Sequence, residues 1–139
     1  HDEYASIIMR LTEELSIVAP QIHICVVKKG DKMSDMIQEI TEHYQRSSVV
    51  MISAKGAAVQ KMVSMVEISK KSIDDKGLQQ FNKLEQVLEE TTKGKDEEKL
   101  LNEISNTKKV FKRPVMSVLL AKGDIDTTSL LGKDWHANS

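Results

Sequence analysis

A length of 139 residues fits one domain built around one core and leaves little room for a second. Hydrophobic residues make up 40% of the chain and charged residues 29%, a globular balance that excludes a collagenous or wholly disordered protein. The 20 basic and 21 acidic residues give a net charge of −1 at pH 7, which argues against a strongly basic protein that coats DNA.

The first third of the chain alternates between helical and strand patterns. Apolar residues at three- and four-residue spacing predict an amphipathic helix over residues 3–18, which ends before Pro20. The short β-branched run at 22–27 predicts a buried strand. Residues 32–45 repeat their apolar positions with helical period, and 49–52 predict a second buried strand.

A third helix is predicted over residues 57–72, after a glycine at position 56. Met65 and Ile68 widen its apolar surface beyond a single stripe. A helix that is apolar on two sides usually packs against its own sheet and against something else. We therefore expect Met65 and Ile68 to contact a partner protein.

The second half of the chain is less regular. The apolar spacing of residues 78–88 favours a helix over a strand. The acid-rich stretch at 85–106 predicts a solvated, flexible connection. Residues 114–120 predict a last strand, and Pro114 at its start favours an edge of the sheet, where a missing N–H does least harm.

The order of these elements predicts an α/β protein. Alternating strands and helices with short connections favour a two-layer sandwich with the helices on one face of the sheet. We divide the chain into an N-terminal helix (1–20), a sandwich domain (21–123) and a C-terminal tail (124–139). Exposed tryptophan is uncommon, so Trp135 predicts that this tail docks on another surface.

Lysines follow two neighbouring strands of the predicted sheet. Lys28, Lys29 and Lys32 come after the first strand, and Lys55 comes after the second. Because the carboxyl ends of parallel strands lie at the same edge of a sheet, these lysines can meet there and contact phosphates. A scattered, solubilising surface is the alternative interpretation.

The turn after the second predicted strand has features of an anion site. Lys55 and Lys61 flank it, and the free N–H groups and positive dipole at the start of the following helix would suit an anion. The Gly-Lys-Ser/Thr order of a P-loop is absent, so we do not expect a nucleoside triphosphate. An ordinary turn that needs Gly56 for its positive φ is the alternative.

The residue patterns give no support for catalysis, a cofactor, a metal or a membrane. His23 and Cys25 share one face of a strand, but two ligands are not a site, so a core role is favoured. No GxSxG motif or buried carboxylate pair is present. A single cysteine indicates a reducing compartment, and no apolar stretch approaches the roughly 18 residues that span a bilayer.

Three segments together resemble the signature of the Alba superfamily. Residues 50–61 read VMISAKGAAVQK, residues 65–68 read MVEI, and a Lys-Lys pair follows at 70–71. In that family a strand ends in a basic-Gly turn, followed by a small residue, an apolar residue and lysine. The pair Lys28-Lys29 resembles the family's Lys-Lys loop. The sequence of these segments is most similar to the eukaryotic branch, the fungal Alba-type subunits of ribonuclease P and ribonuclease MRP.

The resemblance has consequences for the fold. It implies the order strand, helix, strand, helix, strand, strand, so residues 78–87 are expected to be a strand although their spacing favours a helix. An N-terminal helix and an acidic insert before the last strand are additions to this Alba-like sandwich. With the neutral net charge, they favour a heterodimeric subunit over a chromatin-coating homodimer.

The resemblance also implies a function. We expect a non-catalytic RNA-binding subunit of ribonuclease P and ribonuclease MRP that acts in tRNA 5′-leader and rRNA precursor processing, in the nucleus and nucleolus. It would bind a stem and internal loop of the catalytic RNA as a heterodimer with a second Alba-like subunit, beside other ribonucleoprotein subunits. The alternatives are a protein interaction subunit that dimerises with little RNA contact, and an Alba-type mRNA-binding translation regulator.

Specific residues follow from this expectation. The dimer-interface residues would be Met65 and Ile68. The RNA-binding residues would be Lys28, Lys29, Lys32, Lys55, Gly56, Ala57, Gln60 and Lys61.

Overall fold

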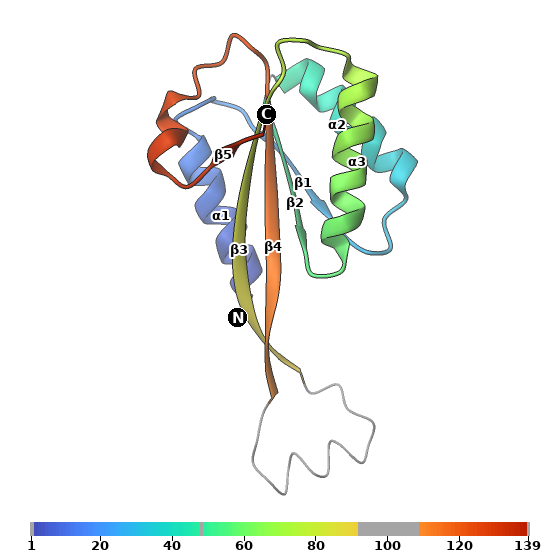
Figure 1. Ribbon diagram of the computed structural model, residues 1–139, viewed down its shortest axis with the longest axis vertical. Coiled ribbons are helices and arrows are strands. Elements are labelled where there is room, and N and C mark those ends of the chain that lie inside the picture. Colours follow the sequence, from blue (N-terminus) through green and yellow to red (C-terminus); the bar gives the residue numbers. More distant parts are fainter. Residues whose placement is uncertain (1, 48, 92–108, 139) are drawn as a thin grey trace, which may run out of the picture.

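The structure is a computed structural model that describes residues 2–47, 49–91 and 109–138. The helices in these ranges are α1 (Glu3–Leu15), α2 (Met33–Ser47), α3 (Ala58–Ile73) and a short 3₁₀ helix, η1 (Thr128–Gly132). The strands are β1 (His23–Val27), β2 (Val49–Lys55), β3 (Gln79–Thr91), β4 (Lys109–Ala121) and β5 (His136–Ala137). They form one sheet in the order β1-β2-β4-β3-β5, with α1 on one face and α2 and α3 on the other (Figure 1).

The face under α2 and α3 is built from the alternating elements that the sequence predicts. β1 and β2 are parallel and are joined through α2, while β4 runs antiparallel to β2. Ile40 of α2 and Met62 of α3 are fully buried against Ile52 of β2 and Leu120 of β4. The predicted α/β sandwich is therefore present on this face.

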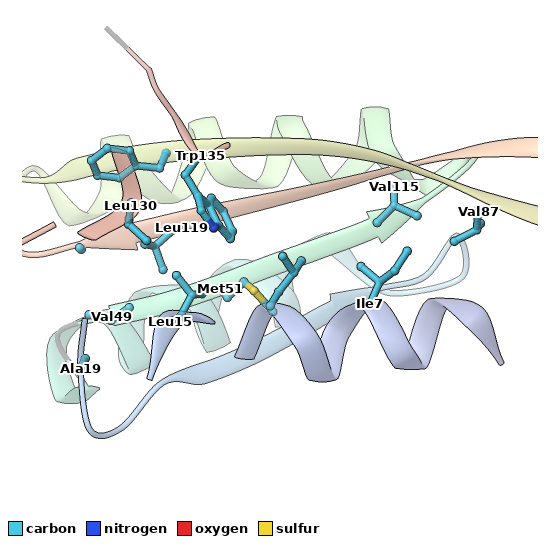
Figure 2. Close-up of a cluster of buried hydrophobic side chains, with 13 residues drawn as sticks. Ile7, Leu15, Ala19, Val49, Met51, Val87, Val115, Leu119, Leu130 and Trp135 are labelled. Atoms are coloured by element: carbon cyan, nitrogen blue, oxygen red, sulfur yellow. The ribbon is translucent and has the colours of Figure 1, made fainter. Parts of the chain in front are cut away.

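Helix α1 covers the opposite face of the sheet. Its apolar residues Ile7, Leu11 and Leu15 pack on a second core that includes Met51 and Leu119 (Figure 2). The expectation that all helices share one face is wrong for α1. The reason is that β2 and β4 bury apolar side chains on both of their faces, so the second face also needs a cover.

Strand β3 forms where the apolar spacing favours a helix and the Alba resemblance implies a strand. It pairs with β4 from Gln79 opposite Ala121 to Thr91 opposite Lys109. The predicted flexible connection at 85–106 is therefore wrong for residues 85–91, which are part of this ladder. Its acids are compatible with a strand because Glu85 pairs with Arg10 of α1. Residues 92–106 lie outside the described residues.

Pro114 lies inside β4, and β4 lies between β2 and β3, so the prediction of an edge strand is wrong. Strand β2 ends at Lys55, opposite Val115. The Pro114 carbonyl accepts a hydrogen bond from Gly56 N at 2.8 Å, and in an antiparallel pair the N of the same residue points toward the same neighbour. The missing N–H thus faces the turn beyond the end of β2 and removes no ladder bond.

The C-terminal tail docks on the protein's own sheet. Leu130 and Trp135 are buried in the core under α1, as Figure 2 shows for both side chains. The tail ends in β5, which pairs with β3 through Ala137 opposite Phe81. Within the described residues, none of the helices has the length and apolar character needed to cross a membrane.

Candidate nucleic-acid interface

The carboxyl ends of β1 and β2 meet at one edge of the sheet, as their parallel pairing requires. A cavity of about 400 Å³, called here the strand-end cavity, lies at this edge. As predicted, it brings Lys28 and Lys29 beside Lys55, whereas Lys32 is not among the described residues that line it. Its lining includes Lys28, Lys29, Lys55, Ala57, Asp2 and Tyr4.

Lys28 and Lys29 are the exposed cations of this cavity. Their loop is held by Asp31, whose carboxylate accepts a hydrogen bond from Lys28 N at 2.8 Å. Lys32, also predicted, is exposed just before α2 begins. Within the part of the chain that the structure describes, the ammonium groups of Lys28 and Lys29 form no ion pair, so both charges are free to meet a phosphate.

Lys55 is held in a different way. Its ammonium group forms an ion pair with Glu89 of β3 and lies 5.4 Å from the centre of the Tyr4 ring. The hydrogen bond from Lys55, with a smaller contribution from Arg113, holds the pKa of Glu89 below its ordinary value. Glu89 is therefore ionised at neutral pH, and it offsets the Lys55 charge.

Gly56 shapes the turn between β2 and α3. Its φ of 58° lies in the left-handed region, where glycine is favoured. The prediction that its N–H binds a phosphate is wrong, because this N–H donates to the Pro114 carbonyl. Ala57 lines the cavity at the start of α3, and Gln60 is exposed in its first turn.

Lys61 supports the loop rather than extending freely into solvent. Its Nζ donates to the carbonyl oxygen of Lys29 at 2.8 Å and to that of Asp31. An ammonium group has three donors, so two of them are used inside the protein. Lys61 thus ties α3 to the loop that carries Lys28 and Lys29.

The predicted partner surface is only partly present. Met65 is 0% exposed and belongs to the core under α2 and α3, so its prediction as an interface residue is wrong. Ile68 is 46% exposed. Sequence reasoning missed Leu84 and Leu88 of β3, which are 71% and 56% exposed and share one face of the strand because side chains alternate.

Comparisons with known proteins bear on the fold. The Alba family model matches residues 23–87. Among solved structures, 23 chains match, including Alba from Thermoplasma volcanium, with a TM-score of 0.50, 15% identity, and coverage of 72% of this chain and 100% of that chain. The chain has an Alba-like fold. A search among curated proteins finds no match.

The Alba match begins at β1 and ends within β3, so α1 and the C-terminal tail lie outside it. The start of α1 nevertheless reaches the strand-end cavity. Asp2 caps α1 by accepting hydrogen bonds from the N–H of Tyr4 and of Ala5, at 3.0 and 3.2 Å. The Tyr4 hydroxyl donates to Ser53 Oγ at 3.0 Å, and burial raises the pKa of Tyr4. A carboxylate and a phenol from outside the Alba match thus join the lysines.

Arg113 is a second site residue that sequence reasoning missed. Its side chain lies against the Gly56 turn, and its Nε lies 3.4 Å from Glu89. The sequence signal was the basic pair before Pro114. It was overlooked because the last strand was expected to begin at residue 114, whereas β4 begins at Lys109.

Proposed function

We propose that this protein is a non-catalytic RNA-binding subunit of ribonuclease P and ribonuclease MRP, and that it works as half of an Alba-type heterodimer. The supporting observation is the strand-end cavity, where cations from two strands meet beside the start of α3. Lys28 and Lys29 supply free positive charge, and the start of α3 adds the positive end of its dipole. Such a surface suits phosphate oxygens.

The distribution of charge favours structured RNA over generic nucleic acid. Net charge is near zero, so the attraction to phosphates comes from one edge of the molecule rather than from its whole surface. A-form RNA has a wide, shallow minor groove and phosphates at fixed spacing, which a rigid loop can recognise by shape. Lys61 holds the Lys28-Lys29 loop rigid, and this supports recognition of a stem with an internal loop.

A partner subunit would cover apolar surface that this chain leaves exposed. Leu84 and Leu88 lie on the α3 side of the sheet, since Leu84 is opposite Met116 of β4, which packs on the core under α3. Two large exposed leucines on one face of a strand suit a protein contact. We propose that a second Alba-like subunit packs there, with the catalytic RNA held by the pair.

In this proposal the RNA carries out the phosphodiester hydrolysis, and the protein braces it. The complex would act in tRNA 5′-leader and rRNA precursor processing, in the nucleus and nucleolus, together with other ribonucleoprotein subunits. The proposal rests on the similarity of residues 50–61 and 65–71 to the fungal subunits and on the cation arrangement described above.

A dimerisation subunit with little RNA contact is the second candidate. The observation that favours it is that Lys55 and Lys61, two of the predicted phosphate ligands, are already engaged by Glu89 and by loop carbonyls. Only the exposed lysines would then be left to meet RNA. The two candidate functions predict different molecules that copurify with the protein from cells.

The test is copurification of the tagged chain from native cells, with sequencing of the bound RNA and mass spectrometry of the bound proteins. We expect two abundant RNAs, those of ribonuclease P and ribonuclease MRP, and one Alba-like partner in equal amount. Many mRNAs bound to a homodimer would contradict the proposal and favour a translation regulator. A stoichiometric partner without RNA would favour the dimerisation subunit.

A second experiment tests the partner surface. Leu84→Lys with Leu88→Lys should abolish coelution with the Alba-like partner, because a charge would be buried in the interface. The matched control is Leu131→Lys in the tail, which is 80% exposed and lies away from this face. If both proteins keep the partner equally well, the partner binds elsewhere.

A further inference from the structure

A cluster of possible metal ligands lies between β1 and α2, away from the strand-end cavity. His23 and Cys25 point to the same face of β1, and Glu39 of α2 faces them. One ligand atom from each of these three residues lies within 4.8 Å of the other two. The sequence alone placed only two of them together, because Glu39 is brought to the strand by the packing of α2.

The separations of the ligand atoms are close to those of a tetrahedral metal site. His23 Nε2 lies 3.4 Å from Glu39 Oε2, and Cys25 Sγ donates to the same oxygen at 2.8 Å. Zinc bonds of 2.0 to 2.3 Å place neighbouring ligand atoms about 3.3 to 3.7 Å apart. The imidazole and carboxylate atoms already lie in this range. The thiol lies closer than this to the carboxylate and within 4.8 Å of the imidazole, so it must move by about 1 Å once its proton has left.

We propose that His23, Cys25 and Glu39 bind one zinc ion, with water at the fourth position. On binding, the S–H bond of Cys25 is replaced by a bond from sulfur to the metal, and the proton leaves to solvent. A thiolate and an imidazole favour zinc over magnesium or calcium, which prefer oxygen ligands alone. No oxidation or reduction is involved, because zinc has one stable charge.

Burial and exposure at this cluster suit a metal site. Cys25 is 1% exposed, whereas the side chains of His23 and Glu39 are 26% and 41% exposed, so an ion can enter from solvent and reach a protected sulfur. Burial, with the neighbouring carboxylate, raises the pKa of the Cys25 thiol, so zinc must displace a firmly held proton, which lowers the apparent affinity. The carboxylate is the group that distinguishes this cluster from an apolar core.

His43 is not among the proposed ligands. Its ring stacks on that of His23, with 3.3 Å between the ring centres and 4° between the planes. The nitrogen lone pairs lie in the ring planes, so two parallel rings cannot direct them to one ion. Stacking instead fixes the plane of the His23 ring.

The proposed zinc would join the edge strand β1 to α2. In the sheet order, β1 has one neighbour, β2, and on its other side no described strand pairs with it. His23 begins β1 and Lys28 follows its end, about 16 Å away at the rise of a strand, so the zinc and phosphate sites are separate. Zinc binding can therefore be tested whether or not the proposed function holds.

The experiment uses the full chain, freed of metal with a chelator and titrated with Zn²⁺ or Co²⁺ alone. We expect one ion per chain, a higher midpoint of thermal unfolding, and with Co²⁺ a thiolate charge-transfer band in the near ultraviolet. Glu39→Gln and His23→Gln should each lower zinc affinity on the order of 100-fold, and Cys25→Ser should remove the band.

The matched control is Glu42→Gln, which makes the same charge change at an exposed position of α2 and should leave zinc affinity unchanged. Because Cys25 is buried, Cys25→Ser is checked for folding by circular dichroism, and the half-exposed Glu39 gives a second, milder variant. The proposal is overturned if the natural chain binds no zinc at micromolar concentration, or if Glu39→Gln binds as tightly as the natural chain.

Discussion

The two faces of the sheet are covered in different ways. On one face, α2 and α3 lie within the residues that match the Alba family and pack through apolar side chains such as Ile40 and Met62. On the other face, α1 and the C-terminal tail come from outside that match. The two segments meet there although they are far apart in sequence (Figure 1).

The second face relies on a polar network as well as on apolar contacts. The ammonium group of Lys83, which is 7% exposed, donates to Glu14 of α1 at 3.1 Å and to the Lys133 carbonyl at 2.8 Å. Trp135 Nε1 donates to the same carboxylate at 3.4 Å. One buried cation thus joins β3, α1 and the tail. The Alba-like part thus supplies the cations of the strand-end cavity, and α1 and the C-terminal tail cover the other face of the sheet.

Core substitutions give the largest expected effects. Ile40→Ala under α2 should lower the free energy of unfolding by about 3 to 4 kcal/mol, because it leaves a cavity between two helices and the sheet. Leu11→Ala under α1 should cost about 2 to 3 kcal/mol, because a single helix can shift to fill part of the space. Urea unfolding measures both. If Leu11→Ala lowers the free energy of unfolding as much as Ile40→Ala does, α1 is as firmly fixed as α2.

The polar network should have the next largest effect. Lys83→Met keeps the apolar stem but removes the donor of the Lys133 carbonyl and one of the donors of the Glu14 carboxylate, and should cost about 1 to 3 kcal/mol. Lys133→Met is the control, since only its backbone takes part, and it should change stability by less than about 0.5 kcal/mol. Equal stability of the two variants would show that the network contributes nothing.

Lys61 tests whether the cation loop depends on α3. Lys61→Met removes both bonds to the loop carbonyls and should lower the free energy of unfolding by about 1 to 2 kcal/mol. Lys71→Met at the exposed end of the same helix is the control. If Lys61→Met weakens RNA binding and leaves stability unchanged, Lys61 contacts phosphate directly.

Glu89 gives the smallest expected effect on stability. Its pKa lies below that of the unfolded chain, so its stabilising contribution is present at neutral pH and is lost as the pH falls below about 4. Glu89→Gln should therefore be slightly less stable at pH 7, and its stability should converge with that of the natural chain in acid. Urea unfolding at several pH values checks this.

Glu89→Gln should also raise RNA affinity a few-fold, because Lys55 and Arg113 lose their counter-ion. Glu42→Gln is the control, an exposed glutamate in the second half of α2, away from the cation loop. Unchanged RNA binding by Glu89→Gln would mean that Lys55 and Arg113 do not face the RNA.

Hydrophobic periodicity was enough to predict α1, α2, α3, β1 and β2. It failed for β3, where Phe81, Leu84 and Leu88 have helical spacing although the chain is extended. The partner strand β4 imposes this conformation, and a pairing with a distant strand leaves no local signal. Periodicity also could not predict which face of the sheet α1 packs on, because it identifies the apolar side of a helix but not the surface that this side contacts.

Some features of the candidate site could likewise be predicted from the sequence, and others could not. The meeting of Lys28 and Lys55 could be predicted, because parallel strands end at one edge. The ion pair of Lys55 with Glu89 could not, because it depends on the register of β3. Met65 was misjudged because the apolar width of a helix does not reveal how much of it two neighbouring elements bury.

The salt dependence of RNA binding tests most directly whether Lys28 and Lys29 bind RNA phosphates. The measurement is the affinity of the protein with its partner subunit for the RNA stem at several salt concentrations. Lys28→Ala with Lys29→Ala should weaken binding and flatten the log–log slope by about 1.4 to 1.8, from two lost phosphate contacts. The control is Lys71→Ala with Lys76→Ala, in the last turn of α3 and just after it, at the end opposite the cavity, which should leave the slope unchanged. A slope for Lys28→Ala with Lys29→Ala equal to that of the unmutated complex would show that these two lysines do not bind phosphate.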